Sequence, residues 1–179
     1  LARKGIDDIT LLSIEEEVVD SINNQRLNIN YFPNIKLSRN LKATTDIEIL
    51  KDADVIFMAI PSTAVVGYLF DKKDYINPEA IIVNLAKGFG KGDCLIPNCL
   101  VGHFPNTLMM MKGPSFAREI INRQETGFTL ACENNECFSE VADLFENTNV
   151  RFDYSNDING VEYASILKNI YAIIIGMLD

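Results

Sequence analysis

Short apolar runs alternate along the chain with segments in which apolar residues recur at helical spacing. The strand-like runs are 9–12, 41–44, 54–60, 80–85, 106–111, 126–131 and 150–154. The helix-like segments are 15–23, 46–50, 63–70, 116–122, 134–146 and 159–178. Continuous rather than alternating hydrophobicity, as in 54–60, is typical of strands covered on both faces of a parallel sheet. This alternation predicts an α/β fold.

Polar residues that directly follow the apolar strands are candidates for binding, because α/β folds bind ligands at the carboxyl ends of strands. Lys87 follows the run 80–85, and there it could reach a phosphate or carbonyl oxygen as a compact cation. A surface lysine in a turn is the alternative. Ser115 lies in the strand-to-helix turn 113–115, whose N–H groups and hydroxyl suit an anion. The alternative role of Ser115 is to cap the helix, which is compatible with binding.

Lys168 stands inside the apolar helical segment 166–175. A lysine that faces a core is costly unless it is paired or has a depressed pKa. Lysines of that kind exchange protons in catalysis. A place on the exposed stripe of an amphipathic helix is the alternative, and composition leaves both open.

Charge and cysteine usage narrow the function classes. A net charge of -9 and a pI of about 4.6 disfavour nucleic-acid binding, although a few local cations suffice for a small anionic substrate. No run of about twenty apolar residues predicts a membrane span. The cysteines, Cys94, Cys99, Cys132 and Cys137, lack the spacing of common zinc sites, so no metal is expected. We expect reduced thiols in a cytoplasmic protein.

Several segments, taken in order, resemble the NAD(P)-dependent glycerol-3-phosphate dehydrogenases. They are 30–37 (NYFPNIKL, similar to the family's YLPGIKL), 40–46, 60–62, 86–88, 113–117, 158–162 and 167–169. Each is weak alone, but the ordered set spans nearly the whole chain. The resemblance implies that dihydroxyacetone phosphate and sn-glycerol 3-phosphate are interconverted by hydride transfer with NAD or NADP, which feeds glycerophospholipid synthesis.

The resemblance also assigns roles to individual residues. Lys168 matches the family's proton-acceptor lysine, and Lys87 matches a lysine that contacts both substrate and cofactor. The remaining matched contacts are Gly113 and Ser115 for the substrate, and Ala117 and Tyr31 for the cofactor. Asn169 would neighbour the catalytic lysine. The oligomeric state stays open, with a homodimer among the options.

The family pattern also predicts what surrounds this sequence. No GxGxxG occurs, so we expect a Rossmann-like doubly wound parallel sheet that lacks its first strand and glycine-rich loop. Residues 1–157 would form this partial NAD(P)-binding domain. Residues 158–179 would begin an all-α substrate domain whose phosphate clamp lies beyond them. The chain is thus expected to be truncated at both ends.

Some positions depart from the family pattern. Ile14 stands where an arginine often meets the 2′-phosphate of NADP, which favours NAD, with Glu15 as a candidate ribose ligand. Lys112 replaces a small polar residue, and Ala164 and Ser165 replace glycines, so larger side chains could crowd the site. An inactive truncated remnant and another two-domain NAD(P)-dependent hydroxyacid dehydrogenase are the alternative interpretations.

Overall fold

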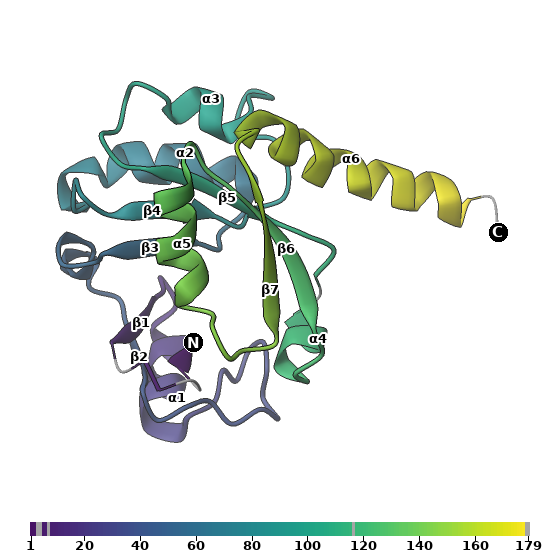
Figure 1. Cartoon of the computed structure of the whole chain (residues 1–179). Helices are drawn as coiled ribbons and strands as arrows, with labels where there is room; N and C mark the ends of the chain where they lie inside the picture. The colour runs from purple at the N-terminus through teal and green to yellow at the C-terminus, as the bar shows by residue number, and fades with distance from the viewer. Residues whose placement is uncertain (3–4, 7, 116, 178–179) are drawn as a thin grey trace. The chain divides into compact units, whose positions relative to one another are not determined.

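The structure is a computed structural model that describes residues 1–2, 5–6, 8–115 and 117–177, except the side chains of residues 118, 169 and 172. The chain divides into two compact units, Leu1–Ile49 and Leu50–Asp179, and each is described by itself (Figure 1). A short 3-10 helix, η2 (Ile47–Lys51), falls at the boundary between them.

The N-terminal unit is a β-α-β arrangement. Strand β1 (Ile9–Leu12) pairs in parallel with β2 (Leu41–Thr44), and α1 (Glu16–Gln25) connects them. Helix α1 buries Val18 and Ile22 against Ala43 of β2, which explains their apolar character at helical spacing. The Asn23 side chain accepts from the N–H of Ala43 at 2.9 Å and donates to its carbonyl at 2.8 Å. The helix is therefore tied to β2 by both packing and hydrogen bonds.

The larger unit contains a five-stranded sheet in the order β3-β4-β5-β6-β7. Its strands are β3 (Val55–Met58), β4 (Ile81–Asn84), β5 (Leu108–Lys112), β6 (Thr126–Ala131) and β7 (Val150–Ser155). Its helices are α2 (Ser62–Asp71), η3 (Lys73–Tyr75), α3 (Ile96–Leu100), α4 (Ala117–Ile121), α5 (Asn135–Asp143) and α6 (Ile158–Gly176). Strands β3, β4 and β5 are parallel, as are β6 and β7, but β6 runs antiparallel to β5. The expected α/β class is confirmed, with this one reversal in the sheet.

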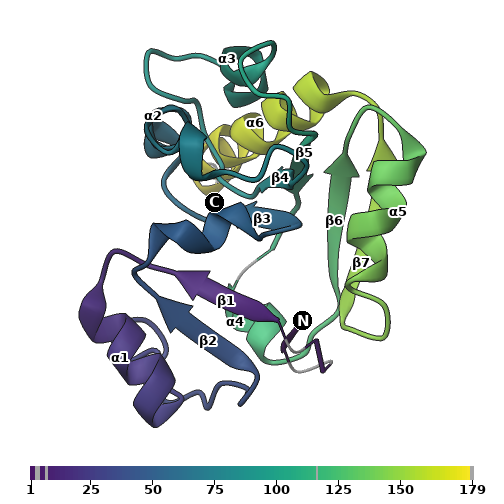
Figure 2. The ribbon, with the colours of Figure 1, turned by 90° about the vertical axis from the view of Figure 1, so that its left-hand side faces the viewer.

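Helices α2 and α5 lie on opposite faces of this sheet (Figure 1, Figure 2). Helix α2 buries Val65 and Leu69, and α5 buries Val141. Strand β4 is buried at every position, as are Met109, Met110 and Met111 of β5. Coverage on both sides is the physical reason for the continuous apolar runs in the sequence.

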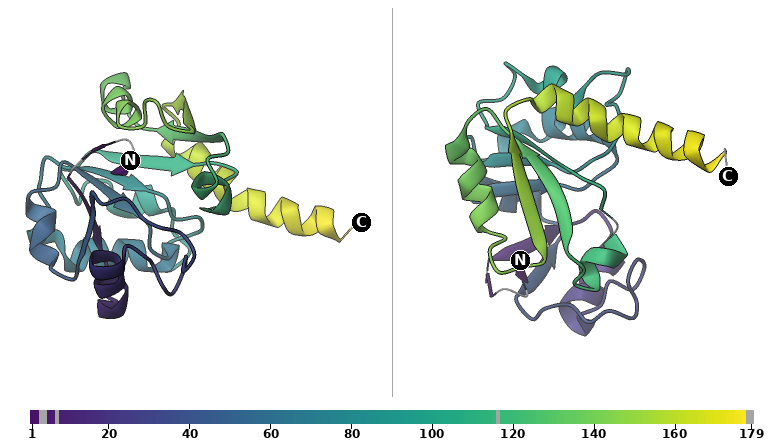
Figure 3. Two further views of the ribbon diagram at one scale, coloured as in Figure 1. Left: turned by 90° about the horizontal axis from the view of Figure 1, so that it is seen from below. Right: turned by 45° about the vertical axis from the view of Figure 1, so that its right-hand side comes forward.

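Helix α6 begins on the sheet and then extends beyond it (Figure 3). Its first turn is capped by Asp157, whose carboxylate accepts from the N–H of Gly160 at 2.8 Å. Near this start Glu162, Ser165 and Ile166 are buried, whereas later apolar side chains such as Ile173 are exposed. No helix in the described part of the chain is long and apolar enough to cross a membrane.

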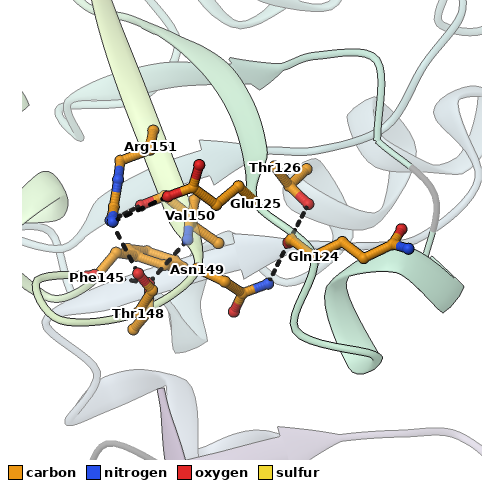
Figure 4. A network of polar contacts seen from close by, with 8 residues as sticks. All are labelled: Gln124, Glu125, Thr126, Phe145, Thr148, Asn149, Val150 and Arg151. Atoms are coloured by element: carbon orange, nitrogen blue, oxygen red, sulfur yellow. Dashed lines mark hydrogen bonds and ion pairs between the residues drawn. The ribbon is translucent and has the colours of Figure 1, made fainter.

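A network of polar contacts holds together the N-terminal ends of β6 and β7 (Figure 4). The N–H of Thr126 donates to the Asn149 carbonyl at 2.9 Å, and the Asn149 side chain donates to the Gln124 carbonyl at 2.7 Å. Arg151 and Glu125 form an exposed ion pair at 3.4 Å, which adds little to stability. The hydrogen bonds fix the register of β7, the strand that leads into α6.

The cysteines differ from expectation at one pair. Cys94 and Cys99 are joined as a disulfide, so the expected reduced state is wrong for these two residues in this structure. They lie five residues apart in the segment that leads into and along α3, close enough to meet. Cys132 and Cys137 are free thiols.

Asn106 provides a test of how β4 and β5 are aligned. Its buried amide donates to the carbonyls of Asn77 and Ala80, both at 2.8 Å. Asn106→Ala leaves these carbonyls without their donor and should lower the free energy of unfolding by about 1–3 kcal/mol in urea titrations. Asn159→Ala, on the exposed surface of α6, is the control and should change stability little. Equal stability of the two variants would contradict this role of Asn106.

Candidate active site: a lysine cluster at the ends of two strands

Two of the residues singled out in the sequence meet at the carboxyl ends of β4 and β5. These strands are parallel neighbours, with Asn84 paired to Met110, so the segments that follow them leave the sheet side by side. The Lys87 amine lies 3.4 Å from the carbonyl oxygen of Ser115 and 3.5 Å from its hydroxyl oxygen. The structure therefore brings Lys87 to the turn that contains Ser115, and both lie beyond the carboxyl ends of strands, where α/β folds bind ligands.

The local backbone explains why glycines stand beside these residues. Gly113 follows β5 where it approaches β6, and a Cβ there would lie 2.5 Å from the carbonyl oxygen of Gly127. Gly88 has a φ of +138°, and a Cβ on it would lie 2.7 Å from the Ser62 hydroxyl oxygen. Both turns therefore require a residue without a side chain, which keeps Lys87 and Ser115 in their places.

A buried ion pair lies next to Lys87 and was not foreseen as a pair. Lys112, the last residue of β5, is 3% exposed, and its amine is 2.9 Å from Oε2 of the fully buried Glu162 on α6. The Lys112 amine also donates to the carbonyl of Ala86, the residue before Lys87. The sequence alone indicates only that Lys112 is larger than the small polar residue common at this position. Two features of the sequence could have indicated this pair. Lys112 is a charged residue at the end of an apolar strand, and Glu162 is the one acidic residue in an apolar helical segment.

Burial and neighbouring charges shift the pKa values of the charged side chains in this cluster. Burial lowers the pKa of Lys87, and the nearby charges of Lys168 and Lys112 lower it further. Burial likewise lowers the pKa of Lys112 and raises that of Glu162, and in each case the partner's opposite charge works against the shift. Three lysines thus share the site with one carboxylate, and the excess positive charge favours an anionic ligand.

Lys168 belongs to the same cluster and is half-buried on α6. Its position falls between the two alternatives of the sequence analysis, a core-facing lysine and a fully exposed one. Its charge acts on Lys87, which places the two amines in electrostatic reach of each other. The expected neighbour Asn169 has a side chain outside the described residues.

Besides Lys87, the residues expected to contact the cofactor were Ala117 and Tyr31. Ala117 is the first residue of α4 and is exposed. Tyr31 belongs to the N-terminal unit, where its hydroxyl donates to Oε1 of Glu15 at 2.7 Å. The Asn30 amide donates to the other oxygen, Oε2, at 3.3 Å. The hydrogen bond to Glu15, and then its negative charge, raise the pKa of Tyr31.

The cluster has the chemistry of acid–base catalysis on an anion. A cationic amine can hold a negative group or polarise a carbonyl oxygen, and a second amine can exchange a proton with it. Within the described residues no group of three or more His, Cys, Asp or Glu side chains could hold a metal ion.

The chain is similar in sequence to one family of known proteins along its whole length. Residues 1–138 match the family described as NAD-dependent glycerol-3-phosphate dehydrogenase N-terminus. A glycerol-3-phosphate dehydrogenase [NAD(P)+] of Leptospira biflexa is 37% identical over 100% of this chain and 55% of its own length. One from Carboxydothermus hydrogenoformans is 34% identical over 99% and 54%. The chain spans about half the length of the curated relatives it matches.

Solved structures agree with the fold. The crystal structure of glycerol-3-phosphate dehydrogenase from Coxiella burnetii matches with a TM-score of 0.88 and 28% identity, over 97% of this chain and 54% of that one. A UDP-D-ManNAc dehydrogenase from Pyrococcus horikoshii matches with a TM-score of 0.71 at 14% identity, over 96% and 46%, and shares the fold alone. The fold is Rossmann-like, and the chain belongs to the NAD-dependent glycerol-3-phosphate dehydrogenase family.

Proposed function

We propose that the full-length protein carrying this chain interconverts dihydroxyacetone phosphate and sn-glycerol 3-phosphate with NAD(H) or NADP(H), and thereby feeds glycerophospholipid synthesis. The main observation behind this proposal is that Lys87, Ser115 and Lys168 form a group near the carboxyl ends of β4 and β5. A phosphorylated triose offers an anionic group and a carbonyl, which are the two functions that such a group can address. Membership of the family supports the same assignment.

Each residue of the group has a distinct role in this proposal. Lys168 gives a proton to the developing alkoxide during reduction and takes it back during oxidation. Lys87, Gly113 and Ser115 bind the substrate, with the Lys87 cation polarising the reacting oxygen. Its lowered pKa reflects burial beside other cations, an environment in which an anion is bound strongly. The nicotinamide, when bound, supplies the hydride, with Lys87 and Ala117 beside it.

The N-terminal unit offers a place for the adenosine end of the cofactor. Glu15 lies beyond the carboxyl end of β1, and Tyr31 and Asn30 each donate to one of its carboxylate oxygens. A carboxylate in this position accepts hydrogen bonds from the ribose hydroxyls of NAD and repels the 2′-phosphate of NADP. Ile14 beside it is 93% exposed and brings no positive charge. We therefore infer that NAD is preferred and that Tyr31 acts by orienting Glu15.

We also propose that residues 1–157 belong to the NAD(P)-binding domain and that 158–179 begin a helical substrate domain. Exposed apolar side chains on α6, among them Ile170, Ile173 and Ile174, support a helical domain that continues from α6, because such a helix normally packs against others. A cytoplasmic location and a homodimer are further proposals. Cell fractionation and light scattering of the full-length protein would test them.

Removal of the Lys168 amine tests the proposed reaction. In the full-length protein, Lys168→Met should lower kcat for dihydroxyacetone phosphate reduction by about 100-fold or more, because proton transfer loses its donor. NADH binding, followed by fluorescence titration, should change by less than about twofold, since such a loss affects only the chemical step. Lys42→Met, on an exposed position of β2, serves as the control. No turnover in the unaltered protein with NADH or NADPH would refute the proposed function.

The cofactor preference is tested at Glu15. Calorimetry should give a tighter Kd for NADH than for NADPH, and Glu15→Gln should reduce that ratio by about tenfold, because a charged hydrogen-bond acceptor is lost. Glu17→Gln, on the exposed face of α1, should leave the ratio unchanged. Tighter binding of NADPH by the unaltered protein would contradict the inference.

A further inference from the structure

The buried pair formed by Lys112 and Glu162 is not used by the proposed chemistry, although it adjoins Lys87. Both side chains are almost fully removed from solvent, at 3% and 0% exposure, and their charged atoms are 2.9 Å apart. We propose that this pair positions the start of α6 on the end of β5 and so fixes Lys168 relative to Lys87. The inference rests on the proposed function, and Lys112 and Glu162 are positioning residues in it.

The contacts of the Lys112 amine join three segments at one point. Lys112 ends β5, Glu162 belongs to α6, and the carbonyl of Ala86 directly precedes Lys87. Lys168 lies further along the same helix as Glu162, where a shift of the helix would move it. The amine therefore links the segment that carries Lys87 to the helix that carries Lys168.

Packing around the pair keeps the beginning of α6 on the sheet. Ser165 and Ile166 are buried one helical turn after Glu162, and the Ser165 hydroxyl donates to the Glu162 carbonyl at 2.8 Å. Further along, Leu167 and Ile170 are 41% and 48% exposed. The attachment of α6 to this unit is thus concentrated in the turns that contain Glu162, just before Lys168.

Stability alone is a weak reason for an ion pair in this place. Removing two charges from water costs about as much as their attraction returns, and well-packed apolar residues often serve equally well or better. Glu162 is also incompletely satisfied, since among the described residues neither of its carboxylate oxygens accepts a hydrogen bond of good geometry, although Oε2 forms the ion pair with Lys112. An ion pair nevertheless holds one geometry, because any slide of the helix separates opposite charges in a medium of low dielectric constant. We therefore assign to this ion pair the role of holding α6 in one position relative to β5.

A double-mutant cycle separates position from stability. Lys112→Met and Glu162→Met each leave one buried charge without its partner, so each should lower the midpoint of thermal unfolding of the full-length protein by about 5 °C or more. The double variant replaces the pair by apolar side chains of similar size and should recover most of that loss. A double variant as unstable as the worse single variant would overturn the coupling of the two residues.

The kinetics of the double variant then test positioning. With stability recovered, kcat for dihydroxyacetone phosphate should still be at least about tenfold lower, because small misplacements of catalytic groups are costly. The dissociation constant for NADH should change by less than about twofold, and Lys42→Met should match the unaltered protein. A double variant with recovered stability and normal kcat would refute the positioning role alone. Absence of turnover in the unaltered protein would instead refute the proposed function, and the positioning role with it.

Discussion

The parallel pairing of β4 with β5 is the interaction on which the candidate site depends. Because both strands run the same way, their carboxyl ends meet at one edge of the sheet, where Lys112 is the last residue of β5 and Lys87 follows β4. Apolar side chains cover both faces of this pair of strands and bury it. The backbone thereby brings Lys87 and Lys112 together, and the charge of Lys112 lowers the pKa of Lys87.

Elements with a strong local pattern were predictable from the sequence. The apolar runs 80–85 and 106–111 correspond to β4 and β5, and the long helical segment 159–178 corresponds to α6. The positions of Lys87 and Ser115 just beyond the carboxyl ends of strands were also predictable, because each follows an apolar run. These predictions succeeded because periodicity and position along a strand are properties of the local sequence.

Features that depend on long-range partners were not predictable in this way. The partner of Lys112, Glu162, is fifty residues away on α6. Until the helix is placed on the sheet, nothing in the local sequence shows that Lys112 is buried with an opposite charge. The antiparallel return of β6 and the meeting of Cys94 with Cys99 likewise depend on how the connecting loops close. Lys168 shows the same limit, since its half-buried state lies between the extremes that the helix pattern alone allows.

The most direct test of the account is a crystal structure of the full-length protein with dihydroxyacetone phosphate and a reduced nicotinamide cofactor. We expect substrate oxygens within about 3 Å of the amines of Lys87 and Lys168, with the Lys112–Glu162 ion pair intact beside them. A substrate bound away from the ends of β4 and β5, with Lys168 turned towards solvent, would contradict it.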